Sequence, residues 1–202
     1  MLPRVTHCGN KRLLQVTHVE LTGAQRLVTE TGAGQWGSAL AMSCAMFGLK
    51  CRVYMVRVIY DQKPGRRTMM QTYAAEVLPS PSLQTMFGKS LLEQDPDHPG
   101  TLGVAISEAL EDTVTHDDTK YCLGSVLNHV LLHQSIIGLE TKKQLKLLDL
   151  EPDVIAGCIG GGSNYAGFSY PFMTDKLKGK LDADFVACEP KAVPSNKRCI
   201  HV

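Results

Sequence analysis

VIAGCIGGGSN, residues 154–164, joins a nearly continuous apolar run to three glycines and two small polar residues. The apolar run at 154–159 predicts a β-strand buried on both faces, as the strands of parallel sheets usually are. A predicted helix follows the polar pair and ends at about Leu177. A buried strand, a glycine-rich turn and a helix in this order are typical of an α/β fold.

The same alternation of strands and helices runs outward from this stretch. The predicted strands are short and apolar or β-branched, and cover 26–29, 51–57, 76–78, 121–123, 154–159 and 184–188. The predicted helices are longer, and cover 34–47, 61–74, 83–94, 105–114, 127–148 and 164–177. We therefore expect an α/β fold class with mostly parallel sheets flanked by helices.

Composition excludes several classes of protein. The 202 residues, 44% of them apolar, are enough for one domain or for the core of a two-lobed protein. The net charge is +1, and the Lys and Arg residues are spread along the chain rather than clustered, which argues against nucleic-acid binding. No apolar run approaches the roughly 20 residues of a membrane span. Residues 1–15 lack the apolar core of a secretion signal, so we expect a cytoplasmic protein without membrane contact.

The metal-binding residue types do not form recognisable sites. Seven cysteines are scattered without a CxxC pair, which argues against a disulfide framework or a zinc cluster and predicts mostly buried thiols. His129 and His133 have metal-ligand spacing on a predicted helix. No third ligand accompanies them, and we expect no metal.

A first glycine-rich junction, ETGAGQWG at 30–37, follows one predicted strand and opens a helix. Its small residues let the backbone approach an anion, and the helix N-terminus favours a carboxylate or a phosphate. Gly32, Gly34 and Gly37 also match the dinucleotide-binding pattern GxGxxG. That pattern needs an acid at the end of the second strand, but Asp61 comes later, where it could cap a helix. A dinucleotide-binding domain stays open as an alternative.

The second junction, at 160–164, is the better phosphate cradle. The consecutive glycines leave backbone amides open, and the two polar residues after them add side-chain donors. A plain turn between a strand and a helix requires fewer glycines. We therefore expect this loop to bind a phosphate group, with the residues Gly160, Gly161, Gly162, Ser163 and Asn164.

Together, and in this order, the two loops resemble those of the tryptophan synthase β chain family, which are fold-type II pyridoxal-phosphate (PLP) enzymes. The match runs from about residue 26 to 195. The resemblance implies that Glu30 is the catalytic glutamate and that the phosphate of PLP lies at 160–164. Glu189 would lie near the cofactor ring, and Ser125, in a Leu-Gly-Ser segment, beside the cofactor. The substrate carboxylate would be held by Thr31, Gly32, Ala33, Gly34 and Gln35.

Several residues are more similar to the divergent second subgroup of these β chains. Trp36 replaces a histidine that is common in the main group. The stretches 62–64 (Gln-Lys-Pro), 66–67 (Arg-Arg) and 133–134 (His-Gln) also fit the second subgroup.

The resemblance implies a reaction in which indole replaces the hydroxyl of L-serine to give L-tryptophan. PLP acts as the electron sink, and Glu30 would protonate the departing hydroxyl and later accept a proton from indole. L-serine and indole would be the substrates, with a homodimer and an α subunit as candidate assemblies. Serine or threonine deamination and a non-catalytic remnant stay open as alternatives.

The chain departs from the family at the cofactor lysine. The family carries that lysine in a Ser-His-Lys-x-Asn motif about two dozen residues before the glutamate, where this chain reads THCGN at 6–10. Cys8 stands at the lysine position, and cysteine cannot form the covalent link to PLP. Lys11 is the nearby substitute. The resemblance therefore supports descent from an active enzyme of this family better than it supports activity of this chain.

We expect three segments. Residues 1–25 match the family poorly, 26–150 form an N-terminal, mobile α/β lobe, and 151–202 begin a truncated C-terminal α/β lobe. The chain ends with a polar stretch at 196–202, soon after the predicted strand at 184–188, where a further helix or loop is expected. We therefore expect a fragment or a disturbed gene model that is incomplete at both ends.

Overall fold

The computed structural model describes residues 23–189. The chain forms two compact units, Met1–Leu123 and Gly124–Val202. The division therefore lies at residue 123, whereas the sequence suggested a boundary near 150. The helix at 128–147 belongs to the second unit because it packs closely against the helix at 163–177.

Unit 1 is built on a parallel four-stranded sheet in the order β3-β2-β1-β4. Its strands are β1 (Arg26–Thr31), β2 (Lys50–Val56), β3 (Glu76–Ser80) and β4 (Thr119–Tyr121). In the register of the sheet, Glu30 of β1 lies beside Tyr54 of β2, and Val28 lies beside Tyr121 of β4. The predicted parallel sheet is confirmed.

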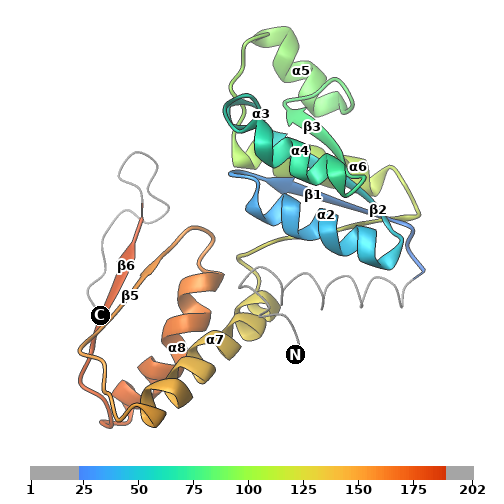
Figure 1. The fold of residues 1–202 in the computed structure, drawn as a ribbon. Helices are drawn as coiled ribbons and strands as arrows, with labels where there is room; N and C mark the ends of the chain where they lie inside the picture. Colours follow the sequence, from blue (N-terminus) through green and yellow to red (C-terminus); the bar gives the residue numbers. More distant parts are fainter. Residues whose placement is uncertain (1–22, 190–202) are drawn as a thin grey trace. The chain divides into compact units, whose positions relative to one another are not determined.

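Helices cover both faces of this sheet (Figure 1). On one face, α2 (Gln35–Phe47) and α4 (Pro64–Thr72) pack around Leu27, Leu40 and Val53. On the other face, α6 (Leu102–Val114) places Ala105 and Ala109 against Val28 and Tyr54. Because side chains alternate along a strand, Glu30 lies on the α6 face with Val28. The remaining helices of the unit are α3 (Arg57–Gln62) and α5 (Met86–Gln94).

The helix predicted at 61–74 is wrong in its bounds, because the structure has two helices there. The break falls at Lys63, and Pro64 begins α4 in the position where a missing N–H costs nothing. Asp61 lies inside α3 and therefore does not cap a helix start as suggested.

Buried acids on α6 hold the sheet and its loops. Asp112 accepts hydrogen bonds from Arg26 at 2.8 Å, Arg52 at 2.9 Å and Tyr54 at 3.0 Å. One turn earlier, the fully buried Glu108 accepts bonds from hydroxyls of the segment 80–85. Pairing of this kind is what allows a carboxylate to remain inside a core.

Unit 2 pairs two parallel strands with two helices. The strands are β5 (Val154–Cys158) and β6 (Asp184–Cys188), and the helices are α7 (Asn128–Leu147) and α8 (Ser163–Leu177). Ile155, Phe172 and Phe185 form its core. The helices approach so closely that a Cβ on Gly167 would lie 2.1 Å from the Cβ of Gln134.

The expectation that the first of these strands is buried on both faces is wrong. Ile155 is buried, but Val154, Ala156 and Cys158 are exposed. The reason is that the described helices of unit 2 cover one side of this two-stranded sheet. Cys158 and its register partner Cys188 are therefore exposed thiols, whereas Cys44, Cys51 and Cys122 are buried as predicted.

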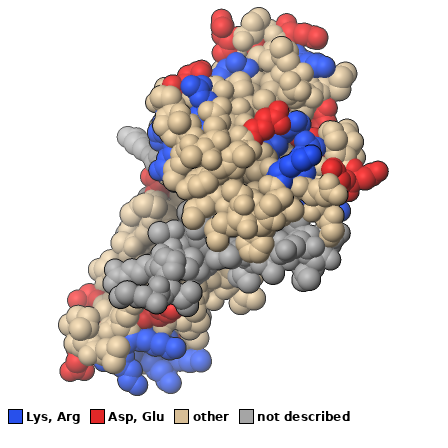
Figure 2. Space-filling model, turned by 45° about the vertical axis from the view of Figure 1, so that its right-hand side comes forward, with Lys and Arg blue, Asp and Glu red and all other residues tan. Residues whose placement is uncertain are grey.

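Two surface properties bear on function. Basic and acidic side chains lie in mixed groups on the face drawn in Figure 2. Within residues 23–189, no helix combines the length and the apolar character that crossing a bilayer requires.

Candidate active site

The first candidate loop begins at the carboxyl end of β1, the end at which parallel α/β sheets place their ligands. Glu30 lies one residue before the end of this strand, and residues 32–34 lead directly into α2. Gly34 takes a positive φ of 94° at the N-cap of α2 and provides no side-chain cap. The chain thus turns sharply from a buried strand into a helix N-terminus that favours negative charge.

Glu30 is buried, with 5% of its surface exposed, and its environment is unusual for a carboxyl group. Burial raises its pKa from 4.5 to about 7, because the charged form loses water. The hydroxyl of Tyr121 donates a hydrogen bond to Oε2 at 2.5 Å and partly opposes this shift. Glu30 can therefore both hold and release a proton near neutral pH, as an acid/base group must.

The residues expected to hold a substrate carboxylate lie in this turn. Gly32 and Ala33 are half-buried and Gln35 is exposed. The hydroxyl of Thr31 is engaged within the protein, because it accepts a hydrogen bond from the amide of Gly37 at 3.2 Å. A Cβ on Gly34 would lie 3.0 Å from the Cβ of Arg66, so the stem of that arginine packs over the turn.

Trp36 ties the loop back to the strand. Its indole Nε1 donates a hydrogen bond to the hydroxyl of Thr29 at 2.7 Å, and that hydroxyl also lies 2.5 Å from the carbonyl oxygen of Cys122. This contact joins α2, β1 and the segment after β4. The tryptophan identified from its sequence position therefore fixes the loop beside Glu30.

The second candidate loop joins β5 to α8 and fits a phosphate group. Gly162 caps α8 with a positive φ of 93° and without a side-chain hydrogen bond. A Cβ on Gly160 would meet nothing within 4 Å, whereas one on Gly161 would lie 2.4 Å from the hydroxyl of Ser125. Only glycine allows so close an approach at 161. The backbone amides at the start of a fifteen-residue helix are a suitable anion site.

The side chains at this loop contact one another and the end of β5. The hydroxyls of Ser125 and Ser163 lie 2.8 Å apart, which brings the two predicted serines together. Asn164 uses its side-chain amide to donate to the carbonyl oxygen of Cys158 at 3.4 Å. Glu189 follows β6 directly, at the same carboxyl edge of the two-stranded sheet, and is half-buried.

The predicted site residues are thus assembled in two groups, each within its own unit. Glu30 and the loop 31–35 belong to unit 1, and Ser125, the loop 160–164 and Glu189 belong to unit 2. Cys8 and Lys11 lie outside the described residues. Their assigned roles therefore rest on the sequence.

Sequence reasoning missed Tyr121, whose hydroxyl contacts the carboxylate of Glu30. It was read only as part of a short strand. The available signal was its position in a strand next to β1, but a pairing between residues 91 positions apart cannot be read from one sequence.

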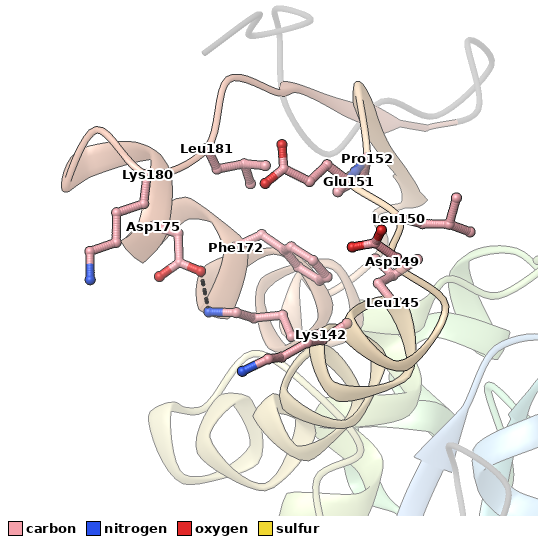
Figure 3. A pocket seen from close by; sticks show the side chains of 11 residues that line it. Lys142, Leu145, Asp149, Leu150, Glu151, Pro152, Phe172, Asp175, Lys180 and Leu181 are labelled. Atoms are coloured by element: carbon pink, nitrogen blue, oxygen red, sulfur yellow. Dashed lines mark ion pairs between the residues drawn. The ribbon is translucent and has the colours of Figure 1, made fainter.

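A separate hollow of about 370 Å³ lies in unit 2, at the C-terminal ends of α7 and α8 (Figure 3). Its lining includes Phe172, Leu181 and the ion pair of Lys142 with Asp175. The glycine loop lies at the opposite end of α8, roughly 20 Å away along a helix of this length. The hollow therefore does not belong to the candidate site.

Replacing Glu30 with Gln should change how stability depends on pH. The carboxyl ionises near pH 4.5 when unfolded but near pH 7 when folded, so the folded chain binds the proton more tightly. The contribution of this proton to the free energy of unfolding is complete below about pH 4.5. It is lost as the pH rises through 7, and the loss is roughly 3 kcal/mol at most. Because Gln does not ionise, urea unfolding of Glu30→Gln should show a smaller loss between about pH 5 and about pH 8. Equal losses in both proteins would contradict the raised pKa.

Comparison with solved structures confirms the fold. A hydrogen sulfide-producing enzyme from Fusobacterium nucleatum has a TM-score of 0.68 over 95% of this chain and 51% of its own, at 18% identity. Threonine deaminase isoform 2 from Solanum lycopersicum has a TM-score of 0.64 over 93% of this chain and 44% of its own, at 17% identity. At such identities, these likenesses concern the fold alone.

Comparison with curated proteins finds much nearer relatives. Tryptophan synthase beta chain 2 of Methanothermobacter thermautotrophicus is 55% identical over 193 residues, which is 96% of this chain and 45% of that protein. Its counterpart in Thermotoga maritima is 56% identical over 96% of this chain and 46% of that protein. The chain thus spans about half the length of the curated relatives it matches. These relatives bear out the resemblance seen in the two loops.

The family described as pyridoxal-phosphate dependent enzymes matches residues 11–201. This match covers both candidate loops and both units of the structure. The chain belongs to the pyridoxal-phosphate dependent enzyme family.

Proposed function

We propose that this chain carries half of a tryptophan synthase β-type active site, in which indole replaces the hydroxyl of L-serine. The observation that carries the proposal is Glu30, a buried carboxyl with a pKa of about 7 at the carboxyl end of β1. It stands directly before a loop suited to a carboxylate. The 55% identity to tryptophan synthase β chains supports this reaction over others of the family.

Glu30 performs the proton transfers in this proposal. In its protonated form it donates a proton to the serine hydroxyl, which leaves as water. The resulting carboxylate then accepts the proton that indole releases when its carbon forms the new bond. A pKa near 7 suits both steps, because each form of the carboxyl is well populated at neutral pH.

Other residues of the chain bind and orient. The turn at 31–35 holds the substrate carboxylate through its amides and the N-terminus of α2. Gly160, Gly161 and Gly162 hold the phosphate of PLP at the N-terminus of α8, with Ser125 beside it and Glu189 near the ring. When bound, PLP supplies the electron sink for the reaction at the substrate's α and β carbons.

The proposal extends to the assembly in which the reaction occurs. A homodimer and a docked α subunit are the proposed partners, and the cytoplasm is the proposed location. Neither nucleic acid nor a membrane has a role in it.

The direct test uses a completed chain. The 202 residues, with Cys8→Lys, would be joined to the C-terminal half of the Methanothermobacter relative and supplied with PLP, serine and indole. Formation of tryptophan supports the proposal. Pyruvate formation that indole does not suppress would indicate a deaminase instead, and no product despite retained PLP would indicate a non-catalytic remnant.

Gly161→Asp should abolish retention of PLP by the completed chain that carries Cys8→Lys. The new Cβ would lie 2.4 Å from the hydroxyl of Ser125, and the carboxylate would repel the phosphate. The measurement is the PLP absorbance that stays with the protein after gel filtration. Gly103→Asp is the matched control, because it adds the same charge at the start of α6, where a Cβ meets nothing closer than 3.8 Å. Equal PLP retention by the two folded variants would exclude the loop as the phosphate site.

A further inference from the structure

Tyr121 and Glu30 form a contact between two neighbouring strands of unit 1. In the register of the sheet, Tyr121 lies beside Val28, two residues before Glu30, so all three side chains project from the same face. The phenol reaches along that face and donates to Oε2 at 2.5 Å. A hydrogen bond to a charged acceptor at this distance is among the stronger ones in proteins.

Within residues 23–189, the titratable groups nearest Glu30 other than Tyr121 are paired with other partners or stay neutral. Tyr54, its register neighbour on β2, donates its hydroxyl to Asp112. Asp112 is also bonded to two arginines, and Glu108 of α6 accepts from hydroxyls of the segment 80–85. Cys122, next to Tyr121, is buried and its pKa is raised to about 12, so it is a neutral thiol. Burial also raises the pKa of Tyr121, which keeps its hydroxyl proton available to donate.

The geometry of α6 explains why the contact can form. Ala105 and Ala109 are the residues that this helix packs against the sheet face carrying Val28 and Tyr54. Tyr121 packs against the same cluster, in which α6 contributes two small side chains. With larger residues at those two positions, the pair would be displaced or the helix would be pushed from the sheet.

We propose that Tyr121 is a positioning residue for Glu30, which holds the carboxyl in one orientation and stabilises its ionised form inside the core. The catalytic value of this contact rests on the proposed function, in which Glu30 is an acid/base group and must reach both protonation states. Burial alone would favour the protonated acid. The phenol offsets that preference, so the carboxylate needed to accept a proton from indole can form near neutral pH.

The test is an NMR titration of the 202-residue chain labelled with ¹³C at glutamate carboxyls, with Glu30→Gln used to assign the resonance. The Glu30 signal should titrate near pH 7 in the unaltered chain. In Tyr121→Phe its midpoint should rise by roughly one to two units, the shift expected for one lost bond to a charged acceptor. Tyr54→Phe is the matched control, because it removes a buried phenol from the same face and should leave the midpoint unchanged.

An equal midpoint in the unaltered chain and in Tyr121→Phe would overturn the proposal. A second measurement applies even where that variant does not fold. In the unaltered chain, the ¹³Cζ resonance of Tyr121 should show an inflection at the same pH as the Glu30 carboxyl, and its absence would equally overturn the proposal. A failure of the proposed function would be seen in a different experiment. In that case Glu30→Gln in the completed chain would still synthesise tryptophan at the normal rate, whatever the titration shows.

Discussion

Glu30→Gln is expected to lower tryptophan formation by the completed chain by roughly 10²-fold or more, the range for a lost acid/base group. Gln can still accept the hydrogen bond from Tyr121, so the variant keeps the shape and the packing of the site. It cannot donate a proton to the departing hydroxyl or accept one from indole. We expect PLP retention to be unchanged, because Glu30 and the phosphate loop belong to different units.

Steady-state kinetics with serine and indole measure this effect. Glu93→Gln is the matched control, because it makes the same change at an exposed position of α5. The control should keep the turnover of the parent. Near-normal synthesis of tryptophan by Glu30→Gln would reject the catalytic role, whereas a loss of PLP would show that the variant had disturbed binding instead.

The chain with its own Cys8 is expected to form no stable covalent link to PLP and to have little or no tryptophan synthase activity. Residues 6–10 keep the histidine and the asparagine of the family's lysine motif, with Thr6 in place of its serine and Cys8 in place of its lysine. Without an amine at that position, PLP would be held only by contacts to its phosphate and its ring. The group that would move the α-proton of the substrate is then missing as well.

Borohydride reduction followed by peptide mass mapping measures the link. No phosphopyridoxyl adduct is expected on the unaltered chain, whereas Cys8→Lys should acquire one at residue 8. Cys8→Ala is the control that removes the thiol without adding an amine. Lys11 lies three residues further along the sequence and is the nearest other amine. An adduct on Lys11 in the unaltered chain would show that the lysine position had been misassigned.

The sequence by itself determined the parallel α/β fold and the two loops. Local signals were sufficient, because the strand at 154–158 is a short apolar run and three glycines between a strand and a helix are typical of a tight turn. The same holds for the strand, the glycine-rich turn and the helix around Glu30.

The tertiary structure alone decided which faces are covered and which side chains meet. The burial of Glu30 and the bond from Tyr121 depend on the pairing of β1 with β4, which brings together side chains 91 positions apart in the sequence. The unit boundary at 123 depends on the packing of α7 against α8, and the exposed face of β5 depends on which side of the strand α8 covers. Local sequence patterns show only the spacing of apolar residues. The pKa of Glu30 is near 7 because elements distant in the sequence exclude water from its carboxyl group.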